Sequence, residues 1–213
     1  MPAFPFFEFR RWIKKEELWG IADDFSKEYW PEATVPIDME IIVEKRLGLN
    51  IEPTPSLLRD HDIDAYLRWD LTGIVVDLEC FMEERFRNRV RFSFAHEIGH
   101  YILHRDVIEQ IGMSTSEDWK NHVLALLEKE YMGYEWQANE FAGRLLVPRK
   151  RLEKEMMKVL RSIKDKELLE HLAANPDAVL AQMSHSLSQP FGVSEEVIEK
   201  RIEREGLWPP NLT

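Results

Sequence analysis

The sequence predicts an α+β fold, in which a small antiparallel sheet lies beside one helix with two histidines and a helical C-terminal segment follows. Apolar residues recur at steps of three and four over long parts of the chain, which is the period of amphipathic helices. Residues 73–78, Gly-Ile-Val-Val-Asp-Leu, form instead a β-branched run that is typical of a buried strand. We therefore expect helices to predominate and the sheet to contain about three short strands.

Helical and extended segments alternate in the first part of the chain. Residues 11–29 place apolar side chains among charges at helical spacing and end before a proline, which predicts an amphipathic helix. Asp38 is a suitable N-cap for a second helix, which would end at Gly48. Residues 49–55 are then predicted to be short and extended, and to join residues 73–78 in the sheet.

Arginines occupy every second position before the histidine helix, at Arg85, Arg87, Arg89 and Arg91. In an extended segment the four side chains would share one side, opposite the apolar side chains. They would then form an electropositive lip that attracts acidic substrate segments, or a solvated face, which is the commoner outcome of such charge alternation. The helix itself is predicted from Arg91 to about residue 105.

The predicted helix contains an H-E-x-x-H motif, His96-Glu97-Ile98-Gly99-His100. Residues four apart on an α-helix lie about 40° apart around the axis and roughly 6 Å apart along it, so His96 and His100 can bind one metal ion. Two neutral imidazoles at this spacing suit Zn²⁺. Glu97 lies too far around the helix to be an obvious ligand but can reach a water held by the metal, which is the position of a general base.

A catalytic zinc site normally has three protein ligands, so a third is expected elsewhere in the chain. The helical stretch 134–147 offers Glu135 and Glu140. Glu135 shares its helix face with small and apolar residues, whereas Glu140 can form a surface ion pair with Arg144. A buried carboxylate is costly unless it is paired or binds a metal, which favours Glu135 as the ligand. Asn139, one turn on, is placed to hydrogen-bond a ligating histidine.

The remaining segments are predicted to be a loop and further helices. Residues 107–118 are expected to form a loop or lid, and residues 119–132 a helix. Beyond residue 148 an apolar stripe lies among basic residues, which indicates packing with a solvated outer face or, alternatively, contact with an acidic partner or nucleic acid. Helices at 178–187 and 194–205 resemble half of a helix-turn-helix, but acids outnumber bases on the second, which opposes binding in the major groove.

Composition limits the functional classes. The 213 residues carry a formal net charge of −11, which disfavours broad binding to nucleic acid. Cys80 is the only cysteine, so the sequence offers neither a disulfide nor a cysteine-based zinc site, in keeping with a reducing compartment. No signal peptide and no membrane-spanning run is recognisable. We expect a cytoplasmic protein, with no membrane association, whose partners are proteins or peptides.

Two motifs together resemble the ImmA/IrrE-type zinc metallopeptidases. One is Arg-x-Arg-Phe-Ser-Phe-Ala-His-Glu-Ile-Gly-His over residues 89–100, followed by Leu-His. The other is Glu-x-x-Ala-Asn-x-Phe-Ala-x-x-Leu-Leu-x-Pro over residues 135–148. The resemblance implies a zincin-like domain, which we predict over residues 1–148, with the helical C-terminal segment over residues 149–213.

The resemblance also implies a ligand scheme and an activity. Zn²⁺ would be bound by His96, His100 and Glu135, and Glu97 would be the catalytic base that takes a proton from water and passes it to the leaving amine. The substrate would be a regulatory protein, in this family typically a DNA-binding repressor of the helix-turn-helix type. The alternative is a non-catalytic zinc-containing module that binds a partner, although the intact Glu97 favours the enzyme. The candidates for stabilising the oxyanion are Tyr101, His104, His122 and Tyr134.

Overall fold

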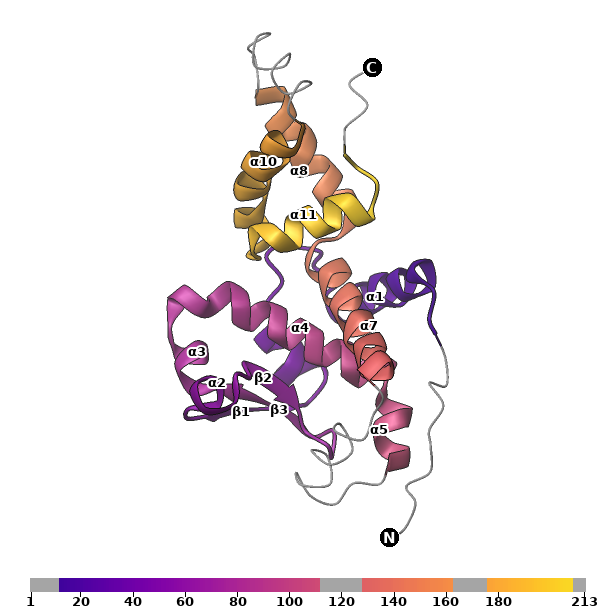
Figure 1. Cartoon of the computed structure of the whole chain (residues 1–213), viewed down its shortest axis with the longest axis vertical. Helices are drawn as coiled ribbons and strands as arrows, with labels where there is room; N and C mark the ends of the chain where they lie inside the picture. The colour runs from indigo at the N-terminus through magenta and orange to yellow at the C-terminus, as the bar shows by residue number, and fades with distance from the viewer. Residues whose placement is uncertain (1–11, 112–127, 163–175, 209–213) are drawn as a thin grey trace.

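The computed structural model describes residues 12–111, 128–162 and 176–208 (Figure 1). Helices predominate, as predicted. The elements in chain order are α1 (Lys15–Tyr29), the π-helix η1 (Ile41–Arg46), β1 (Asn50–Thr54), α2 (Leu57–His61), β2 (Ala65–Leu67), β3 (Gly73–Asp77), α3 (Leu78–Met82), the 3-10 helix η2 (Glu84–Phe86), α4 (Arg87–Leu103), α5 (Arg105–Ile111), α7 (Glu128–Leu146), α8 (Arg149–Ser162), α10 (Pro176–Phe191) and α11 (Glu195–Arg204).

The sheet has three strands in the order β1-β3-β2, and it is mixed. β2 and β3 are antiparallel, but β1 runs parallel to β3, with Asn50 opposite Gly73 and Thr54 opposite Asp77. The expectation of a mostly antiparallel sheet was therefore wrong for β1. The reason is the connection: α2 and β2 lie between β1 and β3, and a long crossover allows two strands to run in the same direction. Gly73 is required at the start of β3, because a Cβ there would lie 2.7 Å from the carbonyl oxygen of Asn50.

The arginine segment is helical, which corrects the extended interpretation. α4 begins at Arg87, four residues earlier than predicted, so that alternate arginines point to different sides of the helix. Arg89 forms an ion pair with Asp64 at 2.5 Å, and Arg91 donates hydrogen bonds to the carbonyl oxygens of Ile37 and Gly192. These arginines connect α4 to distant parts of the chain.

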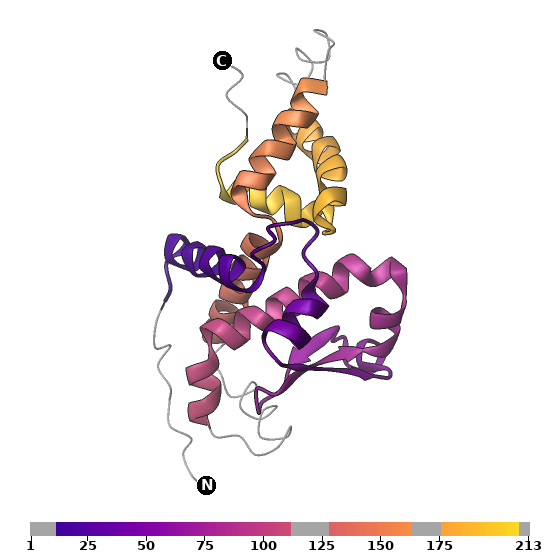
Figure 2. The same ribbon diagram turned by 180° about the vertical axis from the view of Figure 1, so that it is seen from behind.

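α4 and α7 pack closely where Gly99 meets Ala138. A Cβ at Gly99 would lie 3.1 Å from both the Cα and the carbonyl oxygen of Ala138, so only glycine permits this approach without displacing the neighbouring backbone. Apolar side chains of both helices, including Ile98 and Phe141, are completely buried around the contact. α1 packs on the other side of α7, with the rings of Phe25 and Phe141 5.5 Å apart (Figure 2).

The C-terminal helices α8, α10 and α11 lie together at the end of the molecule opposite the sheet (Figure 1). Buried charges attach them to the rest of the chain: Glu205, after α11, pairs with Arg144 of α7 and with Arg201 of α11. Arg144 also pairs with Asp23 of α1 at 2.6 Å. The end of α7 is thus held between α1 and the C-terminal helices.

Several predictions fall partly outside the described residues. The predicted loop at 107–118 is wrong at its start, since α5 extends to Ile111, and its remainder lies in the part of the chain that the structure does not describe. The predicted helix at 119–132 is described only from Glu128, where α7 begins. Among the described helices, none is both long enough and apolar enough to cross a membrane.

Two glycine-to-alanine substitutions test the contact between α4 and α7. Gly20 is exposed on α1 and has no heavy atom within 4 Å of an added Cβ, so Gly20→Ala should raise the free energy of unfolding by up to about 1 kcal/mol through helix propensity. Gly99→Ala should lower it by about 1–3 kcal/mol, because the added methyl group overpacks the interface. Urea denaturation of the metal-free protein measures both effects, and stabilisation by both would contradict the close packing.

Candidate metal centre

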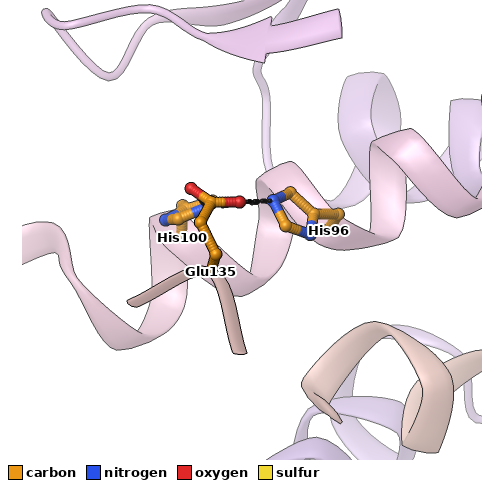
Figure 3. A group of neighbouring side chains, drawn as sticks. All are labelled: His96, His100 and Glu135. Carbon is orange, nitrogen blue, oxygen red and sulfur yellow. Dashed lines mark hydrogen bonds and ion pairs between the residues drawn. The ribbon is translucent and has the colours of Figure 1, made fainter. Parts of the chain in front are cut away.

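Three predicted residues meet between α4 and α7 (Figure 3). The Nε2 atoms of His96 and His100 lie 3.0 Å apart. Glu135 of α7 points between them, with Oε2 3.1 Å from His96 Nε2 and Oε1 3.4 Å from His100 Nε2. The side chains of His96, His100 and Glu135 are 16%, 17% and 31% exposed, so solvent can reach the group. The juxtaposition expected from the two helix faces is confirmed.

The outer nitrogen of each histidine has its own partner. His96 Nδ1 lies 3.1 Å from the Oδ1 atom of Asn139, as the helix spacing predicted. His100 Nδ1 lies 3.0 Å from His104 Nδ1, and His104 Nε2 lies 3.3 Å from the Oε1 atom of Gln137. Burial, together with the neighbouring His100, lowers the pKa of His104 to about 3, so this imidazole is neutral and can accept at one nitrogen while it donates from the other.

These partners fix which nitrogen atoms have lone pairs. The amide oxygens of Asn139 and Gln137 only accept hydrogen bonds, so His96 donates from Nδ1 and His104 donates from Nε2. His104 Nδ1 is then the acceptor for the N–H at His100 Nδ1. In their neutral forms both histidines therefore keep an Nε2 lone pair for a cation. In the metal-free protein, burial lowers the pKa of His96 but its hydrogen bond from Nε2 to Glu135 outweighs this and raises the pKa.

The spacing of the donor atoms also fits a zinc ion. Ligand atoms about 2.0–2.1 Å from Zn²⁺ in a tetrahedral arrangement lie about 3.3 Å from one another. The two Nε2 atoms lie 3.0 Å apart, and one ligand atom from each of the three residues can be chosen so that all lie within 4.8 Å of one another, which is close enough to share one ion. Burial alone would raise the pKa of Glu135, but its hydrogen bonds with His100 and His96 place the pKa below its usual range, so the carboxylate is ionised. Two imidazoles and one carboxylate form a donor set suited to zinc.

Glu97 is beside this group and almost fully buried, with 9% of its surface exposed. Its Oε2 atom accepts a hydrogen bond of 2.7 Å from the backbone N–H of Leu67, at the end of β2. Burial raises the pKa of Glu97, whereas the nearby His100 and His96 and the Leu67 N–H act in the opposite direction. The sheet thus holds the carboxylate of the motif glutamate next to the two histidines.

Glu140 is directed away from the metal-binding group, but the predicted surface ion pair with Arg144 was wrong, because the Glu140 side chain is only 10% exposed and has other partners. It accepts a hydrogen bond of 3.1 Å from Trp19 Nε1 and lies 3.3 Å from Arg204 Nε. Arg144, the predicted partner, pairs instead with Asp23 and Glu205. Glu140 therefore connects α7 to α1 and α11.

Among the candidates for oxyanion stabilisation, three have described surroundings. His104 is buried behind His100, and the Tyr101 hydroxyl accepts a hydrogen bond from Arg105 at 3.2 Å. The ring of Tyr134 packs against His104, with ring centroids 4.8 Å apart. His122 lies outside the described residues. The tyrosines therefore have contacts of their own, and His104 supports a ligand.

Sequence reasoning missed two contributors to the centre, Gln137 and the backbone N–H of Leu67. Gln137 could have been identified, since a glutamine two residues after Glu135 on a largely buried helix must hydrogen-bond another polar group. The Leu67 N–H had none, because a backbone donor is present at nearly every residue.

Comparison with known proteins agrees with this geometry. Residues 84–203, more than half of the chain, match the peptidase family described as the IrrE N-terminal-like domain. The matched region contains α4 and α7, and with them the motif histidines, Glu97 and Glu135. No curated protein sequence and no solved structure matches the chain significantly. The chain belongs to the ImmA/IrrE family of metallopeptidases.

Proposed function

We propose that this protein is a zinc-dependent endopeptidase with a zincin-like fold that hydrolyses a peptide bond in a regulatory protein. The observation that supports this most directly is the convergence of two histidine lone pairs and one carboxylate from α4 and α7 beside a buried glutamate. Membership of a metallopeptidase family supports the reaction class. A DNA-binding repressor of the helix-turn-helix type is the proposed substrate, because the motif resemblance implies it.

In this proposal each residue has a defined role. His96, His100 and Glu135 hold the metal, and Asn139 and His104 orient the two imidazoles. When bound, zinc supplies a Lewis acid that polarises a carbonyl group and lowers the pKa of a water ligand to about 7. Glu97 takes the proton from the attacking water and passes it to the leaving amine. The Leu67 N–H keeps the Glu97 carboxylate in place for both transfers.

Zinc binding tests the ligand set. The wild-type protein should bind one zinc ion per chain, and Glu135→Gln should weaken binding by more than the roughly 10–100-fold that changes around the ligands typically cause. Glu140→Gln makes the same chemical change on the same helix and should leave zinc affinity unchanged, because Glu140 contacts Trp19 and Arg204 instead. Elemental analysis and competition with a chelator measure this, and equal losses in both variants would refute the assignment.

Glu97→Gln separates catalysis from metal binding. The variant should retain zinc but cleave about 10²–10⁴-fold more slowly, because the amide cannot accept a proton. The assay incubates zinc-loaded protein with a helix-turn-helix repressor encoded beside it and follows the fragments by gel electrophoresis and mass spectrometry. Cleavage by Glu97→Gln at the wild-type rate would rule out Glu97 as the general base. A wild-type protein that binds the repressor and leaves it intact would favour the non-catalytic module.

His104→Phe tests the support of His100. The variant fills the buried site but removes the acceptor for the His100 N–H, so zinc affinity should fall by about 10–100-fold. Tyr101→Phe, on the same helix, removes only a hydroxyl that contacts Arg105 and serves as the control. Thermal unfolding of the metal-free proteins accounts for any general loss of stability. Unchanged zinc affinity in His104→Phe would show that His104 has only a packing role.

A further inference from the structure

A cleft of about 690 Å³ lies between α4, α7 and α11, and we refer to it as the α4–α7–α11 cleft. It begins beside the candidate metal centre, because its wall includes Asn139, whose Oδ1 atom is 3.1 Å from His96 Nδ1. Its opposite wall is formed by α11, which belongs to the C-terminal segment. The cleft therefore lies next to the metal centre, although none of the three metal-binding residues lines it, and it ends at a helix whose role the motifs leave undefined.

The cleft continues the helix faces that carry the metal-binding residues. On α4, Ser93 and Arg89 precede His96 by about one and two turns, and both line the cleft. On α7, Asn139 and Gly143 follow Glu135 by about one and two turns, and both line it as well. Residues at such steps share one face of a helix. A polypeptide that continues from the metal centre along these two helix faces would reach this cleft.

The chemistry of the wall favours a ligand with carboxylates and apolar side chains. Five lining residues are basic (Arg85, Arg89, Lys200, Arg201 and Arg204) and three are acidic (Asp64, Glu140 and Glu196), in a chain with a formal net charge of −11. The aromatic side chains in the wall are Phe86, Phe92 and Trp136. Arg85 and Arg89 already pair with Glu83 and Asp64, so the bases that a ligand can reach are on α11. Together with the aromatic side chains, they complement an acidic peptide that also has apolar residues.

The basic residues differ in their availability. Arg201 is only 3% exposed, pairs with Glu205 and lies over the Trp19 ring at 5.0 Å, so it holds the fold together. Lys200 and Arg204 are 64% and 41% exposed and pair with Glu196 at 2.6 Å and Glu140 at 3.3 Å, respectively. Glu196 is exposed as well, and such an ion pair contributes little to stability, whereas the Glu140 side chain is only 10% exposed. Substrate carboxylates can therefore compete for Lys200, while Arg204, which pairs with Glu140 through Nε, offers its other guanidinium N–H groups.

We propose that the α4–α7–α11 cleft binds an acidic substrate segment next to the scissile peptide bond, and that Lys200 and Arg204 of α11 select it. This inference rests on the endopeptidase function proposed above and assigns a role in specificity to the C-terminal segment. A single-stranded nucleic acid is the competing anionic occupant. The three acidic side chains in the wall oppose a continuous phosphate backbone, whereas a peptide can place uncharged residues beside them.

The test is a binding experiment with the zinc-loaded Glu97→Gln protein, which requires no turnover. Fluorescence anisotropy compares a short labelled peptide rich in glutamate and tyrosine with the same peptide in which every glutamate is replaced by glutamine. We expect the acidic peptide to bind at least about tenfold more tightly, and Lys200→Glu/Arg204→Glu to abolish the difference. The preference should weaken as salt is added, because the contacts are exposed.

Lys150→Glu/Lys154→Glu is the matched control. These lysines are also exposed and four residues apart, but they lie on α8 outside the wall of the cleft, and their reversal changes the net charge by the same amount. The control should retain the preference for the acidic peptide. Equal binding of the two peptides, equal losses in both double variants, or tighter binding of a labelled oligonucleotide would each overturn the proposal.

The binding result is independent of the proposed reaction. If wild-type protein cleaves no repressor but the Glu97→Gln protein still prefers the acidic peptide, the endopeptidase function fails and the cleft remains an acidic-peptide site. If the wild-type protein cleaves a repressor but neither peptide is preferred, the endopeptidase function stands and the role of α11 in selection is wrong.

Discussion

The metal centre depends on the close approach of α4 and α7 at Gly99. Because this residue has no Cβ, the backbone of Ala138 can lie against it, and the Glu135 carboxylate reaches both histidines. When both imidazoles are neutral, as a bound metal requires, their Nε2 lone pairs repel each other and the Glu135 carboxylate. Burial of apolar side chains such as Ile98 and Phe141 on the two helices supplies the free energy that holds these donors together. The packing of two helices thus imposes an arrangement that a cation completes.

Much of the site could be predicted because a helix fixes the spacing of residues that share a face. The pairing of His96 with His100, and the position of Glu135 and Asn139 on one face of α7, follow from steps of three and four alone. The partner of Glu140 could not be predicted in this way. Arg144 lies one turn away, but it binds Asp23 of α1 and the buried Glu205 after α11 instead, and these neighbours are distant in sequence. Local spacing offers candidate partners, and tertiary packing decides among them.

The errors in the predicted fold have similar physical causes. Alternating arginines have the period of a strand, but Val90 and Phe94 are buried on the helix face that packs on the core, and this period prevails over the charge pattern. The direction of β1 depends on how α2 and β2 connect it to β3, which a short extended segment does not encode. The Leu67 N–H that holds Glu97 has no counterpart in sequence, since any strand edge offers such donors.

The carboxylate of Glu205 has consequences for the size of the folding unit. It is completely buried and pairs with Arg144, Arg149 and Arg201 from three different helices. Together with Asp23 and Trp19 of α1, it lies outside residues 84–203, the region that matches the family. A fragment limited to that region would leave buried guanidinium groups without their carboxylates, and breaking one buried pair typically costs about 3–5 kcal/mol. The part of the chain that carries the chemistry is therefore smaller than the part needed to keep α7, and with it Glu135, in position.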